Sequence, residues 1–204
     1  MTQKLEVHPS HPQPRMLRLV ANMIRDGGIV VYPTDTSFAL GCHLGDKNAL
    51  ERIVRIRRLN KHHQFTLCCR DLSELGTYAR VDNSGYRLLR RLTPGPFTFV
   101  MKASREVPRR LLHPKRRSIG IRVPAHPVAQ ALLAEVAEPL LTTTVRMPGE
   151  DEPLSSADEI SDRIGKLVDA ILDDGSHGNE VSTVLDLTGS QPAVIRQGAG
   201  VLDM

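Results

Sequence analysis

Two threonines and an aspartate follow a short apolar run in the first quarter of the chain. The run Ile29–Val31 is β-branched and predicts a buried strand, which Pro33 ends because proline supplies no backbone donor. Thr34, Asp35 and Thr36 therefore lie at a strand end, where rigid backbone fixes two hydroxyls and a carboxylate. Such a set suits a small polar ligand. It also suits an ordinary turn, in which these side chains bond to their own backbone.

An arginine falls on the apolar face of a helix expected at residues 47–58. Leu50, Ile53 and Val54 share one face at about 100° per residue, and Arg57 lies in the middle of that face. A guanidinium in this position either extends to the surface along its own stem or meets a buried anion. That anion can be a structural carboxylate or a ligand phosphate.

A basic segment occupies residues 105–117, which hold one acid, Glu106. Its cations are Arg105, Arg109, Arg110, Lys115, Arg116 and Arg117. The cluster predicts either a positive field for phosphates or a solvated loop that Pro108 and Pro114 keep extended.

Composition bounds the class of protein. The chain has 204 residues, 40% hydrophobic and 3% aromatic, with no Trp, so we expect one mainly aliphatic core. Its net charge of +4 points mildly to anionic partners. Three cysteines without a secretory signal are typical of reduced thiols in a cytoplasmic protein. No apolar run reaches the roughly 18 residues of a membrane span, so no membrane partner is expected.

Helical and strand patterns are mixed along the chain. Helices are expected at residues 14–25 and 47–58, after capping boxes at 71–74 and 156–159, from Asn83 to Arg91, and at 128–136. Strands are expected at residues 29–31, 65–69, 97–101, 119–123, 140–145, 168–172, 181–187 and 193–197. Some strands follow one another directly, which predicts a single α/β domain, residues 1–204, on a mixed sheet flanked by helices.

Four blocks together resemble one known family. They are Pro33-Thr-Asp-Thr-Ser-Phe-Ala-Leu-Gly41, Thr93-Pro-Gly-Pro-Phe-Thr-Phe-Val100, Ile121-Arg-Val-Pro-Ala-His-Pro127, and Ser182-Thr-Val-Leu-Asp-Leu-Thr188 with Val194-Ile-Arg196. In this order and spacing they resemble the YrdC/YciO family, the threonylcarbamoyl-adenylate synthases and their relatives. The resemblance implies a twisted mixed sheet with a large open basic cleft.

The resemblance also implies a reaction and its ligands. L-threonine, bicarbonate and MgATP would be held together to give threonylcarbamoyl-adenylate and pyrophosphate, used in tRNA modification. Catalysis by proximity and charge neutralisation needs no nucleophile and no dedicated metal cage. By analogy, the amino acid and its carbamate would meet Thr34, Thr36, Arg122 and Ser182. The nucleotide would meet Arg57, Lys61, Thr144, Arg146 and Arg196.

Three positions depart from the family pattern and resemble the YciO branch. Leu59 replaces the arginine of a Lys-x-Arg motif, Arg146 replaces an asparagine, and Cys68 replaces a histidine. The basic cleft and the 105–117 cluster, together with the resemblance, imply an alternative function, the binding of double-stranded RNA or tRNA without synthase turnover. Its contacts would be Arg109, Arg110, Lys115, Arg116 and Arg117.

Overall fold

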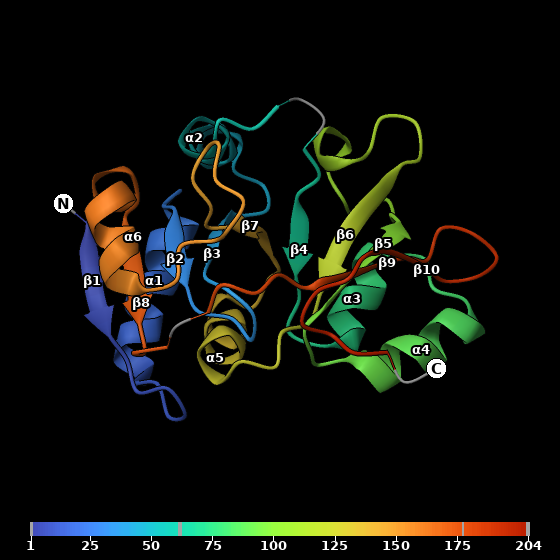
Figure 1. Ribbon diagram of the computed structural model, residues 1–204, viewed down its shortest axis with the longest axis horizontal. Coiled ribbons are helices and arrows are strands. Elements are labelled where there is room, and N and C mark those ends of the chain that lie inside the picture. Colours follow the sequence, from blue (N-terminus) through green and yellow to red (C-terminus); the bar gives the residue numbers. More distant parts are fainter. Residues whose placement is uncertain (1, 61–62, 177, 203–204) are drawn as a thin grey trace.

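The strands of the computed structural model, which describes residues 2–60, 63–176 and 178–202, form one mixed sheet. Within these residues the sheet has ten strands in the order β1-β8-β2-β3-β7-β4-β6-β5-β9-β10 (Figure 1). The sheet contains parallel pairs such as β4–β6 and antiparallel pairs such as β3–β7. The predicted α/β fold with a mixed sheet flanked by helices is confirmed.

The elements have the following bounds. The strands are β1 (Gln3–Glu6), β2 (Val30–Tyr32), β3 (Ala39–His43), β4 (Thr66–Cys68), β5 (Phe97–Lys102), β6 (Ser118–Arg122), β7 (Leu140–Thr144), β8 (Ala170–Asp173), β9 (Thr183–Asp186) and β10 (Ala193–Arg196). The helices are α1 (Pro14–Arg25), α2 (Lys47–Arg57), α3 (Leu72–Tyr78), α4 (Asn83–Leu92), α5 (Pro127–Val136) and α6 (Ala157–Ile164), with short 3₁₀ turns η1 (Arg109–Leu111) and η2 (Gly165–Leu167).

The two faces of the sheet carry different cores, because side chains alternate along a strand. Ile29 and Val31 join a cluster that includes residues of α2, α3, α4 and α6. Val30 and Tyr32 join a second cluster with α1 and α5. On this second face the apolar cover is confined to part of the sheet, and polar residues occupy the rest.

Most local expectations agree with the structure, and three do not. The expected helix starts are confirmed at Asp46 and Ser156, whose side chains accept from the backbone N–H three residues later. Asn83, which the sequence suggested as the cap of the helix that ends near Arg91, is already helical, and the cap is Asp82, which accepts from Gly85 N at 2.7 Å. Strands β1 and β3 were not expected at all.

Candidate functional site

A cavity of about 200 Å³ lies over the polar part of the second sheet face. Its floor comes from residues two apart on neighbouring strands, such as Thr142 and Thr144 on β7, or Gly120 and Arg122 on β6. Such residues point to the same side of a sheet, so the strand register gathers them. Gly120 keeps the floor open, because a Cβ there would lie 3.0 Å from Thr66 Oγ1.

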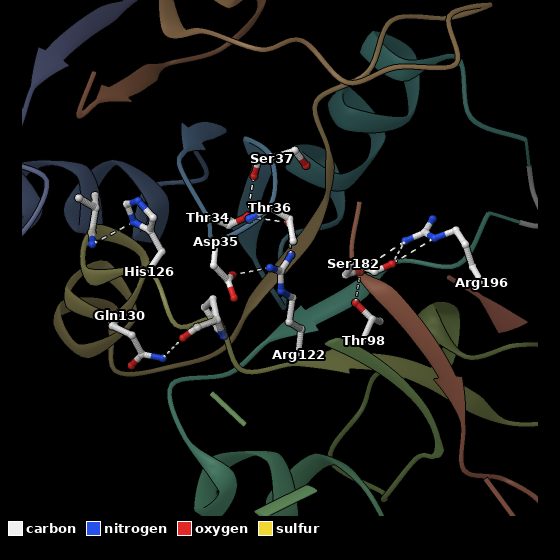
Figure 2. Close-up of polar contacts among 12 residues, drawn as sticks. Thr34, Asp35, Thr36, Ser37, Thr98, Arg122, His126, Gln130, Ser182 and Arg196 are labelled. Atoms are coloured by element: carbon white, nitrogen blue, oxygen red, sulfur yellow. Dashed lines mark hydrogen bonds and ion pairs between the residues drawn. The ribbon is translucent and has the colours of Figure 1, made fainter. Parts of the chain in front are cut away.

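The loop after β2 holds the β6 arginine at one wall of this cavity. Arg122 Nη1 donates to Thr36 Oγ1 at 2.9 Å, and its Nη2 donates to Asp35 Oδ1 (Figure 2). Thr34 Oγ1 lies 3.1 Å from Thr36 Oγ1 and donates to Ser37 O at 2.6 Å. The side chains of Arg122 and Asp35 are only 11% and 14% exposed, so the ion pair is largely desolvated. Thr34 and Arg122 both line the cavity.

The last two strands bring a second arginine to the opposite wall. Ser182 Oγ lies 2.7 Å from Thr98 Oγ1, and Arg196 Nη2 donates to Ser182 O at 2.8 Å (Figure 2). Burial, followed by the charges of Arg146 and Arg122, lowers the pKa of Arg196. Both causes disfavour the charged guanidinium, and a bound anion would favour it.

The end of α2 contributes a buried arginine beside the cavity. Arg57 is 6% exposed, and its Nη1 donates to the backbone carbonyl of Arg146. Burial, and then the charge of Arg146, lowers the pKa of Arg57 to about 10. His63, which lines the cavity, has its pKa lowered to about 4 by burial and then by these two arginines. The neutral imidazole lies with Nε2 3.2 Å from Thr143 Oγ1.

The structure gathers most of the residues that the sequence singled out for small ligands. Five of them line the cavity: Thr34, Arg122, Thr144, Ser182 and Arg196. Thr36 bonds to one of these five, and Arg57 and Arg146 lie close enough to shift the pKa of His63. Lys61 lies outside the described residues. Ser182, which we expected on the threonine side with Arg122, contacts Arg196 instead.

The five residues predicted for nucleic acid do not line the cavity, and two of them have structural partners. Arg110 Nη2 donates to Gly45 O at 2.8 Å, and Arg116 Nη1 lies 3.5 Å from Asp186 Oδ2. The remaining three are exposed: Arg109, Lys115 and Arg117. The cavity covers only part of the second sheet face. The larger open basic cleft that the resemblance implies stays a prediction.

Several lining residues were not singled out from the sequence. No role at the site was predicted for His63, and Thr66 and Thr98 were expected only as strand residues. A signal existed for Thr98, because it lies in a block that resembles the family. For His63 only the fold supplies the signal, since the turn after α2 brings it to Thr143.

A segment after β8 packs against the outer side of the loop that carries Asp35. Asp174 Oδ2 lies 3.0 Å from His126 Nε2, and His126 Nδ1 accepts from Val128 N at the start of α5. When Nδ1 accepts, the ring carries its proton on Nε2, and this nitrogen faces the buried Asp174 carboxylate as an ion-pair contact. Further along, Asn179 forms an isolated bridge with Ser37. The segment after β8 thus contacts the loop of residues 33–38, which we call the threonine loop.

Neither a resident metal nor a membrane span is found in the described part of the chain. No three His, Cys, Asp or Glu residues there are grouped so that they could hold a metal ion. None of the described helices combines the length and apolar character needed to cross a membrane. The three cysteines are free and buried.

Comparison with known proteins assigns the family. The family model described as Sua5_yciO_yrdC, telomere recombination, matches residues 22–198. The chain belongs to the Sua5/YciO/YrdC family. It is 50% identical over 200 residues to the YciO protein of Escherichia coli (strain K12), covering 98% of this chain and 97% of that one. The crystal structure of E. coli YciO superposes with a TM-score of 0.96 and covers 100% of this chain and 98% of that one.

Two more distant members of the Sua5/YciO/YrdC family carry a named activity or ligand. A threonylcarbamoyl-AMP synthase of Vibrio vulnificus (strain YJ016) is 30% identical over 159 residues, 76% of this chain and 84% of the synthase. The crystal structure of P. abyssi Sua5 complexed with L-threonine has a TM-score of 0.89 at 26% identity and covers 97% of this chain and 58% of Sua5. The relationship to the synthases is therefore distant, and the relationship to YciO is much closer.

Proposed function

We propose that this protein binds L-threonine, bicarbonate and MgATP at the cavity and forms threonylcarbamoyl-adenylate. The observation that carries the proposal is the convergence of arginines and hydroxyls without acidic lining. Arg122 and Arg196 face the same cavity, and Arg57 lies buried beside it. Among the described residues that line the cavity, none is an aspartate or glutamate. The positive charge of this cavity is not balanced by acidic lining residues, so it favours ligands that carry phosphate or carboxylate groups.

The chemistry assigned to the site balances without a protein nucleophile. The amino group of threonine and bicarbonate form a carbamate with loss of water. A carbamate oxygen then attacks the α-phosphorus of ATP, the bond from that phosphorus to the bridging oxygen breaks, and pyrophosphate leaves with the bonding pair. The chain's contribution is to bring three reactants together and to neutralise their negative charges.

The geometry favours a division of the cavity between the two arginines. Arg122 is clamped by Asp35 and Thr36, which leaves its remaining guanidinium edge for one fixed carboxylate or carbamate. Among the described residues Arg196 donates hydrogen bonds to Ser182 alone, and the charges of Arg146 and Arg122 act on it. It is therefore better suited to phosphates, which carry more charge.

The size of the cavity limits what it encloses. Pockets that enclose a drug-sized ligand measure about 300–1,000 Å³, whereas this cavity measures about 200 Å³. It therefore fits the amino acid and the reacting groups, and the adenosine would extend from its mouth. Since no acidic side chain among the described residues lines it, Mg²⁺ would enter as part of the MgATP substrate, held by phosphate oxygens.

The test is direct turnover. The protein is incubated with L-threonine, labelled bicarbonate and MgATP, and pyrophosphate and the labelled adenylate are measured. We expect pyrophosphate only when threonine is present, and an Arg196→Ala variant should lose most of it. Absence of both products at enzyme concentrations comparable to ATP would refute the synthase function, and calorimetry with pyrophosphate would then show whether nucleotide binding survives.

The exposed cations of the 105–117 segment support a second candidate, binding of double-stranded RNA or tRNA. Arg109, Lys115 and Arg117 are exposed, and no ion pair is recorded for them within the described residues. Binding of this kind contacts phosphates and therefore weakens steeply with salt. We expect gel-shift affinity for a double-stranded RNA to fall with salt regardless of sequence, and to fall further in an Arg109→Ala/Lys115→Ala/Arg117→Ala variant. An unchanged affinity in that variant would exclude this surface.

A further inference from the structure

A second cavity lies outside the candidate site, on the outer face of α2. It measures about 580 Å³ and is bounded by α2, the loop after β7, α6 and η2. In Figure 1 that loop runs beside α2. Four of its lining residues are arginines, namely Arg52, Arg55, Arg58 and Arg163, and no described lining residue is acidic. We call this cavity the outer groove.

Two of these arginines are already engaged and shape the outer groove. Arg52 Nη2 lies 2.9 Å from Asp169 Oδ2, which ties α2 to the segment before β8. Arg163 donates from Nη1 to Glu150 Oε2 at 3.1 Å, which ties α6 to the loop after β7. These pairs connect neighbouring walls of the outer groove, and they largely compensate the charges of Arg52 and Arg163.

The other two arginines are not compensated in this way. Arg55 and Arg58 are exposed, and neither forms an ion pair with a described carboxylate. Arg58 also ends α2 with φ 48°, a left-handed conformation in which a side chain costs about 1–2 kcal/mol and which usually selects glycine. Arg58 therefore adds a charge without a carboxylate partner to the lining of the outer groove.

The remainder of the lining is aliphatic. Ile56, Met147, Pro148 and Leu167 form an apolar wall, and Leu167 is 49% exposed although it is a large hydrophobic residue. The volume falls within the range of about 300–1,000 Å³ that is typical of small-molecule sites. Arg55 Nε donates to Glu51 O at 3.4 Å, so its two terminal nitrogens have no recorded partner among the described residues. An apolar wall beside two guanidiniums without carboxylate partners matches a ligand that has an apolar body and an anionic group.

We propose that the outer groove is a second ligand site, which binds an organic anion consisting of an apolar body and one phosphate or carboxylate. The apolar body would cover Leu167 and Met147, and the anion would lie between Arg55 and Arg58. The site is independent of the cavity that holds Arg122 and Arg196, since the two cavities share no lining residue.

The test uses 1-naphthyl phosphate and 1-naphthoate, which share an apolar body and differ in the anion. Their naphthalene fluorescence is well resolved because the protein has no Trp. Binding is followed by anisotropy with pyrophosphate present in excess to fill the candidate site. We expect at least one of the two probes to bind, and the stronger one to identify the anion that the outer groove prefers. We expect neutral 1-naphthol to bind at least tenfold more weakly.

The decisive variant is Arg55→Ala/Arg58→Ala, with Arg90→Ala/Arg91→Ala as its control. The control removes two exposed arginines from the end of another helix, α4, and therefore the same net charge. We expect the first variant to weaken the better probe at least tenfold and the control to leave it unchanged. The proposal would be overturned if both variants lost affinity equally or if the first variant bound the probe as well as the wild type. It would also be overturned if neither probe bound or if 1-naphthol bound equally well. Arg196→Ala should leave probe binding intact.

Discussion

Arg57 donates from Nη1 to the backbone carbonyl of Arg146, so the buried guanidinium at the end of α2 faces a segment that carries a second cation. A buried cation is ordinarily paired with a carboxylate. Within the described residues Arg57 has no such partner, and its Nε is buried without a hydrogen bond. The arrangement is unfavourable in the free protein, and an anion bound beside Arg57, as we propose, would compensate its charge. This asymmetry distinguishes a ligand-binding arginine from one that stabilises the fold.

Replacement of Arg57 by methionine tests this distinction, because it keeps most of the side-chain volume and removes the charge. The pKa of Arg57 in the folded protein is about 10, below its unfolded value. The charged form of Arg57 therefore lowers the free energy of unfolding. This loss of stability is complete below about pH 10 and decreases as the pH rises toward the unfolded pKa. At neutral pH we expect unfolding in urea to show a stability equal to or above that of the wild type.

The same Arg57→Met variant should lose affinity for pyrophosphate about tenfold in calorimetry, since a charge-assisted hydrogen bond is removed. Arg91→Met at the exposed end of α4 is the control and should change neither quantity. A lower stability with unchanged pyrophosphate affinity would mean that Arg57 is structural.

The pair between Asp35 and Arg122 predicts strong coupling in a double-mutant cycle. Asp35→Ala leaves the Arg122 guanidinium largely buried without its carboxylate, which costs on the order of 3 kcal/mol. Arg122→Ala leaves the Asp35 carboxylate largely buried without its guanidinium partner. The double variant should therefore lose less stability than the two losses added together, by about 1–3 kcal/mol in urea unfolding. Additive losses would show that the two side chains do not interact.

The sequence predicted α2 and the inward position of Arg57 because both depend on local periodicity. The repeat of Leu50, Ile53 and Val54 identifies one helix face, and Arg57 is indeed buried at its end. Strand β1 escaped prediction for the opposite reason. Its residues are polar and mostly exposed, and they form a strand only because they pair with β8 at the far end of the chain.

The site could be predicted as a set of residue types but not as an arrangement. Ser182 and Arg196 were assigned to different ligands by analogy with the family, although both lie in its last block. Their hydrogen bond follows from a shifted register between β9 and β10, where Arg196 pairs with Val184. Nor could the sequence reveal that β9 lies beside β5 and not beside β8. Such long-range pairing is a property of the whole sheet.

Gly178→Ala should disturb the threonine loop without unfolding the protein. A Cβ at Gly178 would lie 2.3 Å from the carbonyl oxygen of Thr36, so the segment after β8 must move away from that loop. We expect the affinity for L-threonine to fall several-fold and the melting temperature to change little. The matched control is Gly76→Ala in α3, where a Cβ meets nothing within 4 Å and stability should rise by about 0.5–1 kcal/mol. If the affinity of Gly178→Ala for L-threonine is unchanged, the segment after β8 does not influence threonine binding.

His63 should report both the burial of the site and the arrival of an anion. Its pKa is about 4 in the folded protein, below the unfolded value near 6.5, because of burial and then the charges of Arg57 and Arg146. Between these two pH values the unfolded chain binds more protons, so stability falls as the pH drops, by at most about 1.4 kcal/mol per pH unit from this one group. The His63→Gln variant should show a correspondingly flatter pH profile in urea unfolding.

An anion beside Arg57 and Arg146 would offset the positive charge that acts on His63, so its pKa must rise when pyrophosphate binds. Titration of the His63 ring signals by NMR, assigned by their loss in His63→Gln, measures this shift directly. We expect a pKa near 4 without ligand and a value at least one pH unit higher at saturating pyrophosphate. An unchanged pKa at saturation would locate the bound phosphates away from Arg57, on the Arg196 side of the cavity.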